Sequence, residues 1–228
     1  MTTQRELRKS LQAGVTAGLA ARSFHRRGRT ERYVSQEWVA PPLRAELVVA
    51  VESDRYGAVR ISGVADIVVP EVDDFLSDSV PPKALSTVQE IYYGQLPFSV
   101  ALEIFDKMDG VDRRAPLEWR AHSPEDAFSA LEEFLEFVDG PVRRWFDAHS
   151  SVAAVRTAAV RDMADAHGSI IRTVSALDVV LGDLDAAVAR LEAYRPHAVK
   201  ADTPERVDAF LAWLKQAAAA RSADPGWF

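Results

Sequence analysis

Four arginines lie close together in the segment 24–32, near the N-terminus of an otherwise acidic chain. They are Arg26, Arg27, Arg29 and Arg32. Guanidinium groups form paired hydrogen bonds with phosphates and carboxylates, so these residues are the candidate binding site for a phosphate or an acidic partner. Gly28 indicates a turn, so an alternative interpretation is that the segment is a solvated connector between elements. A further alternative is that it pairs with acidic helices of the same protein.

Residue types that commonly catalyse reactions show no motif spacing. The chain has no cysteine, which excludes thiol nucleophiles, disulfides and cysteine metal sites. No pair of histidines has metal-ligand spacing on one helix face; the five are His25, His122, His149, His167 and His197. Zinc-protease, serine-hydrolase and phosphate-loop motifs do not occur. We therefore predict no catalytic residue, no metal site and no cofactor.

Acidic residues gather on a predicted helix that follows residue 122. They are Glu132, Glu133, Glu136 and Asp139. Glu132 and Glu136 are one turn apart and could ligate a divalent cation. The apolar stripe on the opposite side instead favours an ordinary solvated helix face.

The net charge of −7 is unevenly distributed along the chain. Residues 1–40 contain eight Lys or Arg and three Glu, a net charge of +5, so residues 41–228 carry −12. This asymmetry fits a basic arm facing nucleic acid, or two complementary surfaces of one protein. An acidic body repels DNA phosphates, so we rank nucleic-acid binding last.

No segment predicts a membrane span or an export signal. A membrane-spanning helix needs roughly 20 apolar residues, and no window of the sequence approaches this. The first residues carry charges every few positions and lack an apolar signal core. We expect a cytoplasmic protein without a membrane partner.

The elements that position these residues begin with an amphipathic helix. Thr3 and Glu6 form a predicted capping box, and apolar residues recur every fourth position as far as about Arg22. These are Leu7, Leu11, Val15 and Leu19. We interpret Gly14 and Gly18, in the middle of the helix, as a site of close packing against a sheet.

Strands follow the basic segment. β-branched and aromatic residues predict strands at 33–39, 46–51 and 59–64, which we expect to form an antiparallel meander. The strand predicted at 46–51 is nearly all apolar, so we expect it to be the central strand of the sheet. Alternating apolar residues at 98–104 favour another strand, with a helix as the alternative over so short a run. Residues 117–120 are typical of a last strand.

After residue 122 the pattern is helical. Ser123 and Pro124 start a helix that we expect Gly140 and Pro141 to end. Its predicted buried stripe is Phe128, Leu131, Phe134, Leu135 and Val138. We expect a helix at about 151–166 and another from residue 170 to a break at Gly182. A further helix begins at Leu184, and Thr203 and Pro204 mark the start of the last helix.

This order of elements predicts an α+β fold, because strands and helices occupy separate stretches of the chain. We expect an N-terminal helix packed on a small antiparallel sheet in residues 1–122 and a helical lobe in residues 123–228, as one compact unit. The terminal Trp227 and Phe228 are either docked on the fold or free as an anchor.

The run Ser23-Phe24-His25-Arg26-Arg27-Gly28-Arg29-Thr30, followed by the apolar strand Leu47–Ser53, resembles an uncharacterised bacterial domain family. Its members have an N-terminal helix and a Gly-Phe-basic-basic-x-Gly-Arg-Thr run before a strand meander; here Ser23 replaces the first glycine of that run. Such domains often occur near toxin-immunity genes and have no established enzymatic activity. The resemblance implies a binding role and no catalytic residues.

Three hypotheses follow for the function. The first is a non-enzymatic protein-binding module, of toxin-immunity type, that covers a basic toxin-like protein with its acidic helices. The second is an enzyme or small-molecule binder with a site between the sheet and the helical lobe. The third is nucleic-acid binding through the basic segment 24–32.

Overall fold

In a computed structural model the chain forms two compact units. Unit 1 comprises Met1–Val68 and Pro97–Ser151, and unit 2 comprises Val69–Leu96 and Val152–Phe228. The structure describes residues 3–28, 31–77, 98–101, 119–161, 168–198 and 203–223. This division differs from the expected boundary after residue 122, because the helix that begins at Pro124 belongs with the sheet.

Unit 1 contains an antiparallel sheet, which confirms the α+β class. Its described strands are β1 (His25–Arg26), β2 (Arg32–Ser35), β3 (Arg44–Ser53), β4 (Val59–Val68), β5 (Phe98–Ala101) and β6 (Trp119–Ala121). The order is β1-β2-β3-β4-β5, and β6 also pairs with β4. The predicted meander is confirmed in β2, β3 and β4, with the apolar strand β3 between the other two.

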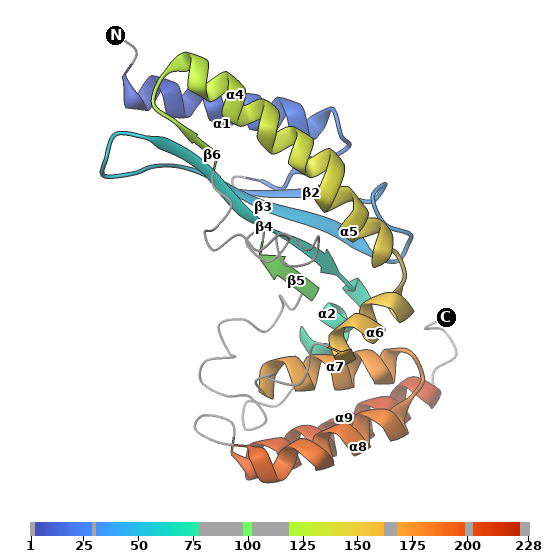
Figure 1. Ribbon diagram of the computed structural model, residues 1–228. Coiled ribbons are helices and arrows are strands. Elements are labelled where there is room, and N and C mark those ends of the chain that lie inside the picture. The colour runs from blue at the N-terminus through green and yellow to red at the C-terminus, as the bar shows by residue number, and fades with distance from the viewer. Residues whose placement is uncertain are drawn as a thin grey trace. The chain divides into compact units, whose positions relative to one another are not determined.

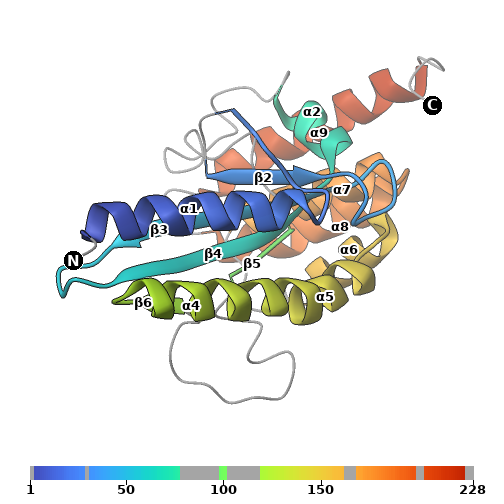
Figure 2. The same cartoon turned by 90° about the horizontal axis from the view of Figure 1, so that it is seen from above.

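One face of this sheet forms the core of unit 1. Successive strand residues point to opposite faces, and on β3 and β4 one alternating set is fully buried. That set is Ala45, Leu47, Val49, Val51, Val59, Ile61, Ala65 and Ile67. The helices α1 (Gln4–Ala20) and α4 (Pro124–Phe137) lie side by side over this face (Figures 1 and 2).

Glycines allow α1 and α4 to approach closely. A Cβ atom added to Gly14 would lie 2.5 Å from Leu131 Cδ2, and one added to Gly18 would lie 2.6 Å from Leu135 Cδ1. The two contacts share a sequence offset of 117 residues, so the helices run parallel in a constant register. The glycines therefore pack against a second helix, and the expected packing against the sheet was wrong.

The ends of α1 are capped by local interactions. Thr3 and Glu6 form the predicted capping box. At the C-terminus the N–H of Phe24 donates to the carbonyl of Leu19, and that of Ser23 donates to Ala20. This is a Schellman motif, and it holds Ser23 in the left-handed region with φ of 63°.

The prediction that Gly140 and Pro141 end the helix was wrong. The α-helical pattern of α4 ends at Phe137, but the chain continues through a π-helical turn, η3 (Val138–Val142), into α5 (Arg143–Ala148). Proline has no N–H to donate and its ring obstructs the preceding turn. A wider turn accommodates Pro141 without ending the helix.

Unit 2 is helical in its described part. Its helices are α2 (Pro70–Ser77), α6 (Val152–Arg161), α7 (Gly168–Val180), α8 (Leu184–Tyr194), the short η5 (Arg195–His197) and α9 (Pro204–Ala223). The break at Gly182 is confirmed, since its φ is +82° and Asp183 caps α8. Trp227 and Phe228 lie outside the described residues. None of the described helices combines the length and apolar character needed to cross a membrane.

Candidate functional site

Two of the predicted arginines converge on one buried carboxylate. Glu46, on β3, has a fully buried side chain, 0% exposed. Arg32 Nη1 lies 3.0 Å from its Oε2, Arg44 Nε lies 2.9 Å from its Oε1, and Arg27 Nη1 lies 3.8 Å from Oε1. A buried carboxylate is tolerated when such partners compensate for its lost hydration.

The other two predicted arginines are Arg26 and Arg29, of which the structure describes only Arg26. Arg26 is the register partner of Tyr33 on β2. The next residue, Arg27, donates its backbone N–H to the carbonyl of Arg32. Arg26 therefore points to the opposite side of the ribbon from Arg27 and is exposed. Arg29 lies outside the described residues. A phosphate clamp of four arginines stays a prediction, but two of its members already contact an acid of this chain.

Glu46 has an acidic cross-strand neighbour. Asp66 on β4 is its register partner and is also buried. The Arg27, Arg32 and Arg44 guanidinium groups supply positive charge to Glu46. In the part of the chain that the structure describes, no group of three or more His, Asp or Glu is placed to hold a metal ion.

Sequence reasoning missed the role of Glu46, although a signal was present. A glutamate that opens an otherwise apolar central strand is unusual, because buried acids require partners. Arg44 two residues earlier shares its face in an extended strand, so the pair could have been found by the two-residue period.

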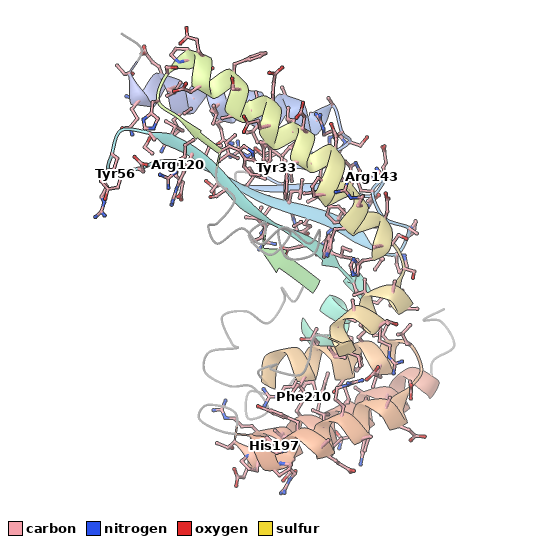
Figure 3. All side chains as sticks on the ribbon, viewed as in Figure 1. Tyr33, Tyr56, Arg120, Arg143, His197 and Phe210 are labelled. Atoms are coloured by element: carbon pink, nitrogen blue, oxygen red, sulfur yellow. The ribbon has the colours of Figure 1, made fainter. Side chains whose placement is uncertain are left out.

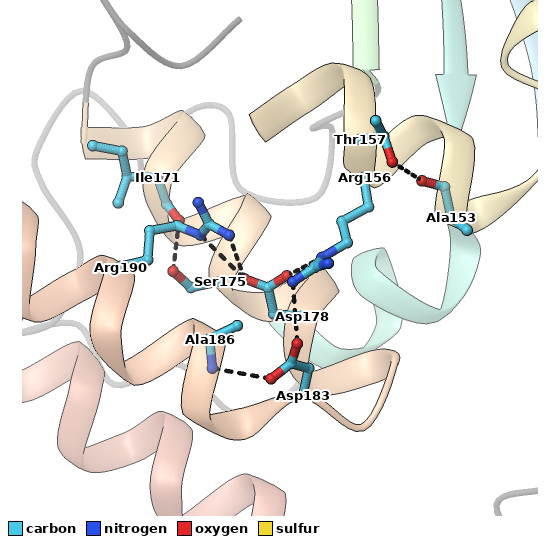
Figure 4. Close-up of polar contacts among 9 residues, drawn as sticks. All are labelled: Ala153, Arg156, Thr157, Ile171, Ser175, Asp178, Asp183, Ala186 and Arg190. Carbon is cyan, nitrogen blue, oxygen red and sulfur yellow. Dashed lines mark hydrogen bonds and ion pairs between the residues drawn. The ribbon is translucent and has the colours of Figure 1, made fainter. Parts of the chain in front are cut away.

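A second buried carboxylate lies in the helical unit (Figure 4). Asp178 on α7 has a side chain that is 0% exposed. Arg156 Nε from α6 lies 2.5 Å from its Oδ1, and Arg190 Nη2 from α8 lies 2.8 Å from its Oδ2. The hydrogen bond to Asp178 and its negative charge raise the pKa of Arg156 above the ordinary value.

This cluster joins three helices and extends to a helix cap. Arg156 also reaches Asp183, whose Oδ1 accepts the N–H of Ala186 in the first turn of α8. Asp178 therefore has a guanidinium partner on each carboxylate oxygen. The arrangement fixes α6, α7 and α8 to one another through charge, and its chemistry is that of a structural ion cluster.

The remaining candidate is the outward side of α4. We define the acidic α4 face as Glu125, Phe128, Glu132, Glu133 and Glu136, all of which are exposed. Residues 123–142 contain six Asp or Glu and no Lys, Arg or His. Glu132 and Glu136 are four residues apart, where like charges destabilise a helix by about 0.2–0.5 kcal/mol.

Phe128 was expected in the buried stripe of α4, and this prediction was wrong, because its side chain is 63% exposed. The residues that α4 buries are Ala127, Ala130 and Phe134. Leu131 and Leu135 enter the spaces left by Gly14 and Gly18, whereas the constant register of α1 and α4 brings Leu11 level with Phe128. Leu11 has a side chain where Gly14 and Gly18 have none, and the Phe128 ring lies outside.

The end of the acidic α4 face is joined to α1. The guanidinium of Arg22 forms an ion pair with Asp139, which continues the 117-residue offset by one further helical step. The Asp139 carboxylate is thereby paired with a guanidinium, whereas Glu125, Glu132 and Glu136 are exposed on the same side of the helix. The face is thus negative with an apolar centre.

Comparisons of the chain with protein-family models, with curated proteins and with solved structures found no match.

Proposed function

We propose that this protein is a cytoplasmic, non-enzymatic protein-binding module of toxin-immunity type, which covers a basic protein partner with its acidic α4 face. The observation that carries the proposal is the exposure of Phe128 among glutamates on a helix segment without basic residues. Complementary potentials accelerate the encounter of two proteins and fix their relative orientation.

The buried ionisable groups support a binding role over catalysis. Glu46 and Asp178 each contact at least two guanidinium groups within the chain. These guanidinium partners engage both carboxylates inside the fold, so neither is presented to a substrate.

Both units have more acidic than basic residues in their sequences. Unit 1 contains 17 Lys or Arg and 19 Asp or Glu. Unit 2 contains 10 Lys or Arg and 15 Asp or Glu. A basic partner would therefore be attracted to either unit. The acidic α4 face has an exposed aromatic ring beside its carboxylates, and this ring supplies contact area as well as charge.

The test is binding of the purified proteins encoded by the adjacent genes, measured by calorimetry at low and moderate salt. We expect one of them to bind and its affinity to fall as salt rises, because salt screens exposed charges. In the double variant Glu132→Gln/Glu136→Gln we expect roughly tenfold weaker binding, on the scale of two lost interfacial charge pairs.

A matched control separates local charge from net charge. Asp185→Asn/Glu192→Gln removes two exposed carboxylates from α8 and changes the net charge by the same amount. We expect this variant to bind like the unmodified protein. Absence of binding by every adjacent gene product at low salt would contradict the proposal, and equal weakening by both double variants would show that net charge alone acts.

A further inference from the structure

The proposed function leaves open what the partner must present to the acidic α4 face. We propose that Phe128 is the anchor of this face and inserts into an apolar pocket of the partner that is rimmed by lysine or arginine. This inference rests on the proposed function, which it deepens by naming the partner's surface chemistry.

The position of Phe128 on the helix carries the first step. Glu125 is three residues before it and Glu132 four residues after it, so the ring has a carboxylate one turn away on each side along the helix. An aromatic side chain surrounded by polar groups is the arrangement of binding hot spots, in which the rim excludes water from the central contact.

The rigidity of the helix around Phe128 carries the second step. Ser123 Oγ accepts the N–H of Asp126 at 3.1 Å, and Asp126 Oδ2 accepts the N–H of His122 at 3.0 Å. Both bonds fix the first turn of α4, immediately before Phe128. A side chain held on a capped helix loses little conformational freedom on binding, so more of its contact energy appears as affinity.

The chemistry of the partner follows from charge. Anionic lipids and nucleic acids would meet Glu125, Glu132 and Glu136 with like charge, and so would the α4 face of a second copy. Exposed basic residues on α1, Arg5, Arg8 and Lys9, leave an α1-to-α4 contact between copies as an outcome for the test. The occupant we infer is a protein surface with an apolar pocket and a basic rim.

Two synthetic helical peptides of equal positive charge are suitable probes. Each peptide has about 18 residues, or five helical turns, and carries lysines along one side of the helix. The opposite side consists of leucines in the first peptide and of alanines in the second. Binding is measured by fluorescence anisotropy at constant salt. We expect the leucine peptide to bind about tenfold more tightly, the scale of burying most of a phenyl ring against apolar groups.

Variants locate the source of that preference. Phe128→Ala should abolish the advantage of the leucine peptide, and it should fold, because the side chain is exposed and alanine favours helices. Leu181→Ala, at an apolar residue that is 42% exposed in the other unit, should keep the advantage. A leucine preference that persists in Phe128→Ala, or is absent from the unmodified protein, overturns the inference.

Two further outcomes are decisive. Sedimentation showing a dimer that Phe128→Ala dissociates would assign this face to a second copy and overturn the inference. If the adjacent gene products fail to bind while the leucine preference depends on Phe128, the proposed function fails and the surface chemistry inferred here stands.

Discussion

At the scale of single residues, Ser23 shows a conflict between local backbone and residue type. It has a left-handed backbone, which costs a residue with a Cβ about 1–2 kcal/mol and costs glycine almost nothing. Its hydroxyl donates to Glu37 Oε2 at 2.6 Å, an exposed bond that offsets little of this. The turn persists because Phe24, the next residue, is buried against Trp38 with ring centroids 4.8 Å apart.

We expect Ser23→Gly to raise the free energy of unfolding by about 0.5–1 kcal/mol. Removing the left-handed penalty outweighs the greater freedom of glycine in the unfolded chain. Ser23→Ala is the control: it keeps the penalty, loses the bond to Glu37, and should be slightly less stable than the unmodified protein. Urea denaturation measures both, and a loss of stability in Ser23→Gly would contradict this account.

At the scale of elements, helices in both units are positioned by specific pairings. In unit 1 the constant offset between α1 and α4 comes from Gly14, Gly18 and Arg22. In unit 2, Asp178 holds α6 and α8 to α7, a helix whose side chains are buried on nearly all sides. Burying a charge in such a helix is costly unless its partners are complete, so the pairing fixes the register of the three helices.

We expect Asp178→Asn to lower the free energy of unfolding by about 2–3 kcal/mol. The substitution keeps the shape but removes the Asp178 charge that Arg156 and Arg190 share. The loss stays below that of fully buried pairs because both arginines are partly exposed.

The matched control is Asp208→Asn, which breaks the exposed pair with Arg195 and should cost less than about 1 kcal/mol. Urea denaturation of both variants is the measurement. Equal losses in the two variants would show that burial of Asp178 adds nothing.

At the scale of the whole molecule, several carboxylates at or near the surface share a lowered pKa. Burial acts to raise the pKa of Asp54, but the N–H groups of Ala58 and Tyr56 outweigh it and lower that pKa. These bonds organise the β3–β4 hairpin, from whose tip Tyr56 projects (Figure 3). Bonds from Thr3 lower the pKa of Glu6, and Arg195 lowers that of Asp208.

We expect stability to fall as the pH decreases through the ordinary carboxyl pKa values of 4.5 and 3.8. Because these pKa values are lower in the folded state, the unfolded chain binds protons first as the pH falls. The carboxylates therefore stabilise the fold above this pH range, and their contribution to the free energy of unfolding is lost below it. Urea denaturation between neutral pH and pH 3 measures the slope. In Asp54→Asn the deficit relative to the unmodified protein should shrink as pH falls, and a flat profile would contradict the assignment.

Much of the fold could be predicted from local patterns. The capping box at Thr3, the meander of β2 to β4 and the break at Gly182 each depend on neighbouring residues, so their signals are present in short stretches of sequence. The candidate binding surface was predicted only in part. The glutamates of α4 were recognised as an exposed face, but the phenyl ring among them was placed in the core.

The sequence by itself determined the α+β class, the antiparallel strands and the starts of the helices, because periodicity and caps act over a few residues. Tertiary structure decided which side chains come into contact, such as Glu46 with Arg27 and Arg32, and Leu131 with Gly14. It also decided that Phe128 is exposed to solvent. Phe128 is exposed although a phenyl ring is equally hydrophobic inside and outside a core, so hydrophobicity alone did not reveal its position. Packing is a property of the assembled surfaces, so only the folded chain fixed which apolar residue remained outside.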